Sequence, residues 1–157
     1  MRPHLCAVAL VPIAVSALFA QTSAESWAGT WILNLSKSTY ELGAPPKSAV
    51  SRLEPSADGW WKGSQDSVDV AGKPAHVETT FKFDGKDYPV DGAANTTWAF
   101  TRIDGHTYDL IAKRDGIITA TARTVVSADG KTRTTTTTAQ GQTLKNVAVY
   151  ERSSTAR

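Results

Sequence analysis

The chain is poor in the residues that most often carry chemistry. Cys6 is its only cysteine, and a single thiol cannot form an intramolecular disulfide or a multi-cysteine metal site. Histidine occurs three times in 157 residues, never in a His-x-His or His-x₃-His spacing, so the usual spacing of a zinc site is missing. No Gly-x-Ser-x-Gly motif marks a serine nucleophile. We therefore expect a protein that is not an enzyme and that needs neither a cofactor nor a metal.

A strong charge of either sign is also lacking. The 17 basic and 15 acidic residues are interspersed, and the formal net charge is +2. Nucleic-acid-binding proteins usually carry a basic stripe, and membrane-surface proteins carry a polybasic or amphipathic segment. The sequence shows neither feature. We expect no nucleic-acid partner and no membrane insertion once the leader described next is removed.

The long apolar run of the chain lies at its start, in residues 5–20. It follows the basic Arg2 and is shorter than the roughly 20 residues that a bilayer crossing needs. Thr22-Ser23-Ala24 then fits the small-x-small pattern of a cleavage site. Residues 1–24 are therefore predicted to be a secretory signal peptide, which takes Cys6 with it. The remaining residues, 25–157, suit one domain that is secreted or periplasmic.

Tight turns divide this domain into short strands. Asp-Gly occurs six times, and the pair favours hairpin turns because both central residues must reach positive φ. Between the turns lie runs rich in β-branched and aromatic residues, and residues 75–83 alternate regularly between the two faces of a strand. Pro89 places its strand at an edge or a bulge. The predicted strands, about nine or ten, are 27–35, 49–54, 60–70, 75–83, 86–90, 96–103, 107–114, 117–127, 132–139 and 143–153.

The fold expected from this pattern is all-β, an antiparallel up-and-down meander that forms a closed or nearly closed barrel. Closure removes the exposed edges of a long sheet. The alternative is a sandwich or another open sheet. A Greek-key sandwich needs long crossovers, and nearly every connection here is short. Residues 36–48 contain Gly43, Pro45 and Pro46 and lack helical periodicity, so we expect a loop there.

Both ends of the mature chain carry a family pattern. Gly29-Thr30-Trp31 begins the first predicted strand, and residues 147–152, in the last strand, read Val-Ala-Val-Tyr-Glu-Arg. This resembles the calycins, which include lipocalins and fatty-acid-binding proteins, and also secreted bacterial proteins called lipocalin-like. The resemblance implies a barrel in which Gly29, Trp31 and Arg152 form a structural closure, with the cation stacked on the indole.

The resemblance has limits that concern the ligand. Fatty-acid-binding proteins place a helical lid after the first strand, which residues 36–48 cannot form. They also bind carboxylate through an arginine two residues before the last-strand tyrosine. Tyr150 is present here, but that arginine position is Ala148. The resemblance therefore extends to the barrel and not to the fatty-acid site.

Several side chains are candidates for the interior. Because adjacent strand residues point to opposite faces, one of Trp60 and Trp61 should face in and the other out. The threonine run at 134–138 has threonine on both faces, so alternation cannot decide which half faces inward. His76 and His106 fit surface positions. The candidate ligand-binding residues are Trp98, Phe100, Tyr108, Arg123 and Tyr150.

Two functions follow from this reading. The first is an exported barrel that binds a small hydrophobic or amphiphilic ligand without catalysis. The second is a packed barrel or sheet in the cell envelope that binds other proteins or glycans and has no internal ligand. The interior separates them, because a carrier needs a pocket of roughly 300 Å³ or more, whereas a packed barrel is filled to the density of an organic crystal.

Overall fold

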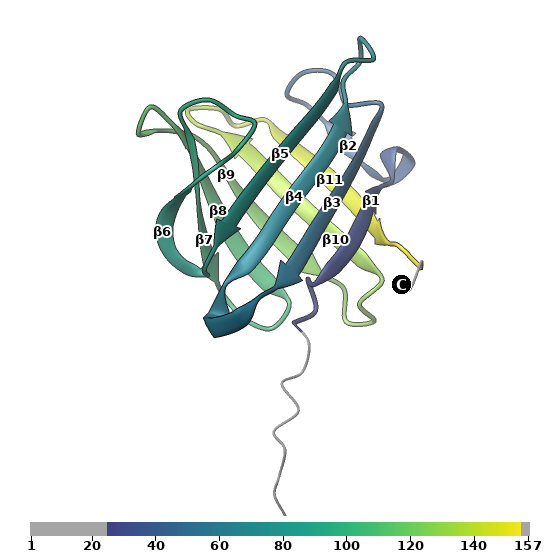
Figure 1. Ribbon diagram of the computed structural model, residues 1–157. Coiled ribbons are helices and arrows are strands. Elements are labelled where there is room, and N and C mark those ends of the chain that lie inside the picture. Colours follow the sequence, from purple (N-terminus) through teal and green to yellow (C-terminus); the bar gives the residue numbers. More distant parts are fainter. Residues whose placement is uncertain (1–24, 155–157) are drawn as a thin grey trace, which may run out of the picture.

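A computed structural model of the chain describes residues 25–154; the predicted signal peptide, residues 1–24, lies outside them. The described residues form a single antiparallel sheet of 11 strands, curled into a barrel (Figure 1). This confirms the predicted all-β meander. The strands are β1 Gly29–Leu33, β2 Thr39–Tyr40, β3 Ser48–Pro55, β4 Trp61–Val68, β5 Pro74–Phe81, β6 Asp84–Pro89, β7 Thr96–Arg102, β8 Thr107–Arg114, β9 Ile117–Val126, β10 Thr132–Ala139 and β11 Lys145–Arg152.

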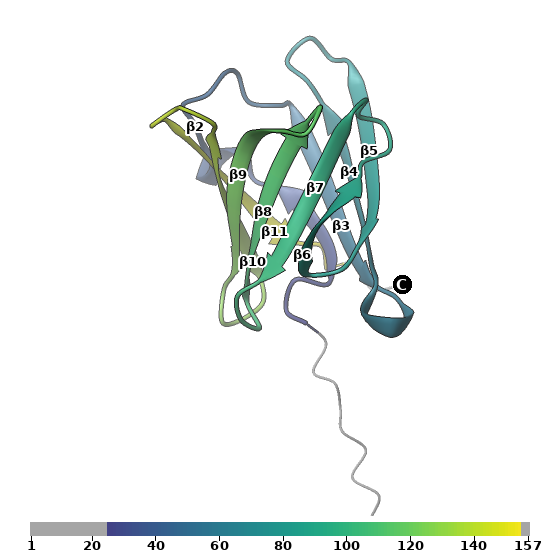
Figure 2. The same ribbon diagram turned by 90° about the vertical axis from the view of Figure 1, so that its left-hand side faces the viewer.

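The first strand of the sheet, β1, pairs with the last, β11, so the two ends of the described chain lie side by side. The order around the sheet is β5-β4-β3-β1-β11-β10-β9-β8-β7-β6, with β2 added beside β11. β5 and β6 are the two ends of this order, so the seam of the barrel lies between them (Figure 2). One bridge joins the seam, where the backbone amides and carbonyls of Glu78 and Asp91 bond each other at 3.0 and 2.8 Å. The barrel is therefore nearly closed.

Two residues show how the sequence builds the seam. Pro89 ends β6, the edge strand, where a missing amide proton does no harm to the ladder. Its carbonyl accepts a hydrogen bond from the Thr79 hydroxyl at 2.9 Å across the seam. Gly92 follows at a φ of +85°, and a Cβ there would lie 2.2 Å from the carbonyl oxygen of His76. Glycine thus allows the two edges to approach at the bridge.

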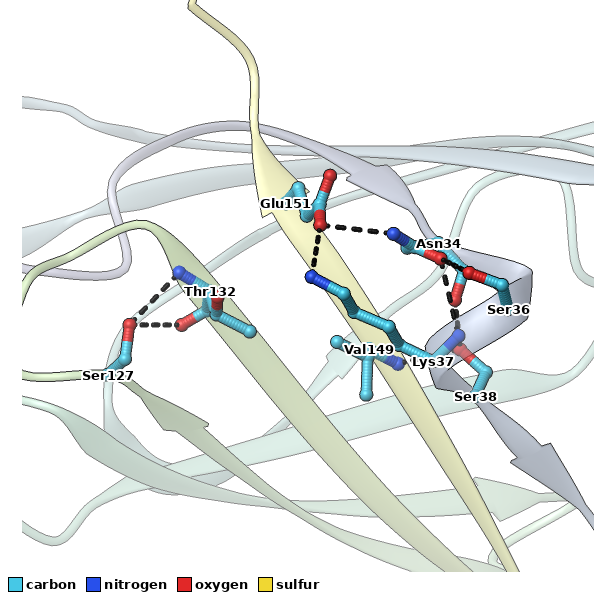
Figure 3. A network of polar contacts seen from close by, with 8 residues as sticks. All are labelled: Asn34, Ser36, Lys37, Ser38, Ser127, Thr132, Val149 and Glu151. Atoms are coloured by element: carbon cyan, nitrogen blue, oxygen red, sulfur yellow. Dashed lines mark hydrogen bonds and ion pairs between the residues drawn. The ribbon is translucent and has the colours of Figure 1, made fainter.

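The segment expected to be a loop, residues 36–48, contains two short regular elements. A 3₁₀ turn, η1 (Leu35–Lys37), is capped by the Asn34 side chain, and β2 follows it. This adds a strand to the predicted number. Figure 3 shows how the turn is tied to β11: Lys37 pairs with Glu151 at 2.8 Å, and the backbone amide of Val149 donates to the Ser38 hydroxyl at 2.9 Å. No α-helix covers the barrel within residues 25–154, and no helix there is long and apolar enough to span a membrane.

Large aromatic side chains fill one end of the barrel. Trp27 and Trp31 are completely buried there, and Phe81 stacks on Phe100 with ring centroids 3.8 Å apart. The Trp31 indole donates to the Trp27 carbonyl at 2.9 Å, which satisfies its polar edge. A second short turn, η2 (Ala57–Gly59), precedes β4 at this end. The buried residues of this aromatic floor and its surroundings are Trp27, Trp31, Ala49, Leu53, Trp61, Phe81, Phe100, Tyr108, Val126 and Tyr150.

The adjacent tryptophans divide between the faces, as alternation predicts. Trp61 is 7% exposed and belongs to the floor, whereas Trp60 is 38% exposed. The Trp60 ring packs edge-on against Tyr88 of β6, at 5.7 Å between centroids, and Lys82 lies 4.9 Å from it. Because Trp60 precedes β4 and Tyr88 belongs to β6, this contact helps to close the seam at the floor end.

Candidate functional site

Above the aromatic floor the barrel encloses a cavity of about 440 Å³. The space exists because the inward positions there carry small side chains, such as Gly63, Ala112 and Ala122. Tyr40 of β2 and Pro46 of the loop after it also line the cavity. The strand β2 lies at the upper end of the barrel in Figure 2. A barrel of this size can be packed or can hold one small ligand. Here the small residues leave room for a ligand.

The cavity wall combines apolar and polar side chains. Its apolar and aromatic members include Leu53, Trp98, Phe100, Leu110, Ala112, Ala120, Ala122 and Ala148. Its uncharged polar members include Ser51, Gln65, Thr124, Thr135, Thr137 and Asn146. The Thr135 hydroxyl lies 2.9 Å from that of Thr124 on the neighbouring strand. An amphiphilic molecule fits such a wall better than a purely apolar one, because buried polar groups need partners.

Four of the candidate binding residues lie on this wall. Trp98 and Phe100 of β7, Tyr108 of β8 and Tyr150 of β11 all line the cavity. Tyr150 is 6% exposed, and burial raises the pKa of its phenol. It is therefore a neutral hydroxyl at physiological pH.

The prediction that Arg123 lines the cavity is wrong. Along β9 the inward positions are Ala122 and Thr124, so Arg123 between them points outward. There it forms a bidentate pair with Asp109 of β8, with both nitrogen-to-oxygen distances at 2.8 Å. These hydrogen bonds hold the pKa of Asp109 below its usual value. Arg123 belongs to the outer surface of the barrel.

The inward arginine is Arg133, which sequence reasoning missed. It lies on β10 directly opposite Tyr150, is 3% exposed and lines the cavity. Its guanidinium carbon lies 4.5 Å from the Tyr150 ring centroid and 5.3 Å from that of Trp31. The sequence does not reveal this orientation, because both faces of the following strand segment carry threonine. In the structure, Arg133 lies on the same face of β10 as Thr135 and Thr137, which also line the cavity.

The register of Arg133 is set by the turn before it. Ser127 and Thr132 tie the β9–β10 hairpin together, since the Thr132 amide donates to the Ser127 hydroxyl at 3.0 Å (Figure 3). The Ser127 hydroxyl in turn donates to the Thr132 carbonyl at 3.2 Å. A shift by one residue would turn Arg133 outward, because strand side chains alternate. The hairpin therefore fixes a cation inside the barrel.

Gly29, Trp31 and Arg152 meet at the floor, where the first and last strands pair. Trp31 is opposite Arg152 in the ladder, and the guanidinium carbon lies 4.2 Å from the indole centroid. Arg152 donates to the carbonyls of Gly130 at 2.6 Å, of Ala28 at 2.5 Å and of Ser26. A Cβ on Gly29 would lie 2.7 Å from Nη1 of Arg152, so glycine makes room for the cation. Burial, with the nearby charge of Arg133, lowers the pKa of Arg152.

The reactive residue types lie elsewhere. His76 pairs with Asp66 at 2.7 Å in an exposed position, and His106 is exposed beside its turn. Residues 25–154 contain no group of three or more His, Cys, Asp or Glu side chains that could hold a metal ion. The cavity lining contains neither an acidic residue nor a histidine. Of the two arginines in the lining, Arg52 pairs with Asp66 at 2.6 Å. The arrangement can hold a molecule through shape, hydroxyls and the cation of Arg133.

Comparison with known proteins gives structural matches. No protein-family model matches the chain, and no curated protein matches it by sequence. The wild-type fluorescent protein UnaG superposes with a TM-score of 0.59 at 15% identity, covering 82% of this chain and 98% of that one. Fatty-acid-binding protein 1 of Echinococcus granulosus gives 0.59 at 16%, covering 82% and 98%. Rv2717c from M. tuberculosis gives 0.50 at 17%, covering 82% and 93%.

The fold is calycin-like. At identities of this size the likeness concerns the path of the chain, and it agrees with the pairing of the first and last strands. The calycin-like barrel here has a 3₁₀ turn and a two-residue strand between β1 and β3. Its interior cation, Arg133, lies on the strand before the last.

Proposed function

We propose that this protein binds one small hydrophobic or amphiphilic molecule inside its barrel, without converting it. The observation that carries the proposal is the cavity of about 440 Å³. Ligand pockets usually measure about 300–1,000 Å³, with apolar and aromatic walls and a few convergent polar groups. The wall built from Trp98, Leu110 and the inner threonines has this character. A packed barrel that serves only as an outer binding surface would not leave this space.

The chemistry of the lining supports binding in place of catalysis. A nucleophile needs a neighbouring base, and a general acid–base pair needs groups that titrate near neutral pH. The hydroxyl groups of Ser51, Thr79 and Thr135 line the cavity with no histidine or carboxylate among the lining residues. The name of the Echinococcus granulosus neighbour, a fatty-acid-binding protein, adds support at the level of the fold.

The predicted signal peptide makes export part of the proposal. Cleavage after Ala20 or Ala24 would produce a mature chain starting at Gln21 or Glu25, outside the cytoplasm. Amino-terminal sequencing of the protein recovered from culture medium or periplasm checks this. Exported protein that still begins with Met1 would contradict the cleavage.

Native mass spectrometry of the protein purified from its own host tests the binding. A carried ligand adds a discrete mass that disappears on denaturation, and extraction of the released molecule identifies it. Titration of the ligand-free protein with phenylnaphthylamine, a neutral apolar dye that fluoresces when bound, provides a second measurement. A protein with no added mass that also fails to bind the dye would favour the alternative, a barrel that acts through its outer surface.

A further inference from the structure

Arg133 is an unusual group to find inside a cavity. It is 3% exposed, yet its Nε and Nη1 atoms have no hydrogen-bond partner. Residues 25–154 contain three buried side-chain polar atoms in this state, and two of them belong to Arg133; the third is the indole nitrogen of Trp27. A buried cation is costly unless it is paired or hydrogen-bonded. The protein therefore maintains an unfavourable group in its interior.

The charge of Arg133 is not balanced by the protein. Its contacts are with the rings of Trp31 and Tyr150, which attract a cation but do not neutralise it. The residues lining the cavity include no aspartate or glutamate. The carboxylates of Asp109 on β8 and Glu151 on β11 have partners of their own, since Asp109 pairs with Arg123 and Glu151 with Lys37. The interior therefore has a positive charge without a counter-charge.

The nearby Arg152 differs from Arg133 in its hydrogen bonds. Its guanidinium also lies against Trp31, but three backbone carbonyls accept its hydrogen bonds. Arg152 completes the floor and is not among the residues that line the cavity. The hydrogen bonds of Arg152 are thus used within the floor. Arg133 lines the cavity, and its Nε and Nη1 atoms have no such partners.

We propose that the ligand carries one anionic head group of the carboxylate type, which binds at the floor of the cavity against Arg133. This inference rests on the proposed function. A guanidinium presents several donors in one plane and pairs well with a carboxylate. The apolar body of the ligand would extend toward Leu110 and Trp98, on the wall nearer the open end. This position differs from the last-strand site that binds carboxylate in the fatty-acid-binding proteins, which is Ala148 here.

The first experiment uses the unaltered protein and two competitors that differ only in the head group. Decanoate and decanol are titrated against bound phenylnaphthylamine. We expect decanoate to displace the dye at a concentration roughly tenfold lower or more, as expected when a hydrogen bond to a charged group is gained. Because no residue is changed, the result does not depend on the folding of a variant.

The second experiment removes the cation. In Arg133→Met the advantage of decanoate over decanol should disappear, so that the two competitors displace the same bound dye at concentrations within about threefold of each other, a small difference in free energy. Arg133→Lys, which keeps the charge but loses the planar donors, should retain part of the advantage. Arg123→Met is the matched control, since it removes an arginine from the outer face of the adjacent strand, and it should leave both competitors unchanged.

The outcomes separate the two proposals. If the unaltered protein does not bind the dye and native mass spectrometry detects no bound ligand, the carrier function itself is wrong, and this inference is wrong with it. If the dye binds but decanol competes as well as decanoate, the carrier function stands and the anionic ligand is wrong. The same conclusion follows if Arg133→Met, folded as judged by circular dichroism, keeps the full preference for decanoate.

Discussion

Arg133 and Arg152 contact the same indole, Trp31, from two neighbouring strands, with guanidinium carbons 5.3 and 4.2 Å from the ring centroid. They differ in their hydrogen bonds. Arg152 donates to three backbone carbonyls, whereas Nε and Nη1 of Arg133 have no partner. The first arginine joins the ends of the chain. The second supplies the charge that we assign to ligand recognition.

The closure at the floor should dominate stability. Trp31 is fully buried, so Trp31→Ala should reduce the free energy of unfolding by about 3–5 kcal/mol through loss of contacts and a residual cavity. Arg152→Ala should reduce it by less. Because the two groups touch, their effects should not add in the double variant. Urea denaturation of the four proteins measures the cycle, and strict additivity would contradict the contact.

Arg133 should contribute little to the stability of the empty protein. Replacing an unpaired buried charge by an apolar side chain of similar length is often neutral or stabilising. We therefore expect the urea midpoint of ligand-free Arg133→Met to equal or exceed that of the unaltered protein, whereas Arg152→Met should lower it. A loss of more than about 1 kcal/mol in Arg133→Met would show that its contacts with Trp31 and Tyr150 stabilise the fold.

A large side chain placed in the cavity should weaken binding of the dye without unfolding the protein. Ala120 lines the cavity beside Ala112, its partner across the ladder. A phenyl ring in Ala120→Phe would occupy ligand space, so dye affinity should fall by roughly tenfold or more, a loss of about 1.4 kcal/mol or greater. Thr121→Phe places the same ring on the outer face and serves as the control. Equal dye affinity in both variants would place the dye outside the barrel.

The ion pair between Asp109 and Arg123 should make the stability of the protein depend on pH. Hydrogen bonds from Arg123 lower the pKa of Asp109 below its usual 3.8. The stability that this shift provides is present above the unfolded pKa and is lost as pH falls through the lower folded pKa. Asp109→Asn should therefore cost up to about 1 kcal/mol at pH 7, as partly exposed pairs do. Urea midpoints should show the difference between the two proteins shrinking as the carboxylate is protonated, and a constant difference would argue for lost packing.

Local pattern was enough to predict much of the fold. Asp-Gly turns and alternating strands are short-range features, since φ preferences and side-chain alternation act within a few residues. They predicted the meander, and the partition of Trp60 and Trp61 between the faces followed from adjacency alone. β2 was missed because its two residues pair only with β11, a contact across more than one hundred residues.

The residues of the candidate site could not be predicted in full, because they depend on how each strand pairs with its neighbours. Arg123 and Arg133 are both arginines in threonine-rich strands, and the local sequence does not distinguish the inner face from the outer. The hairpin between Ser127 and Thr132 sets the register that turns Arg133 inward, and the partner Asp109 holds Arg123 outside. Composition and turn spacing thus predicted an all-β meander. Only the tertiary structure decided which arginine lies inside. One face of each strand becomes the barrel interior when the sheet curls, and the strand register sets which residues occupy that face.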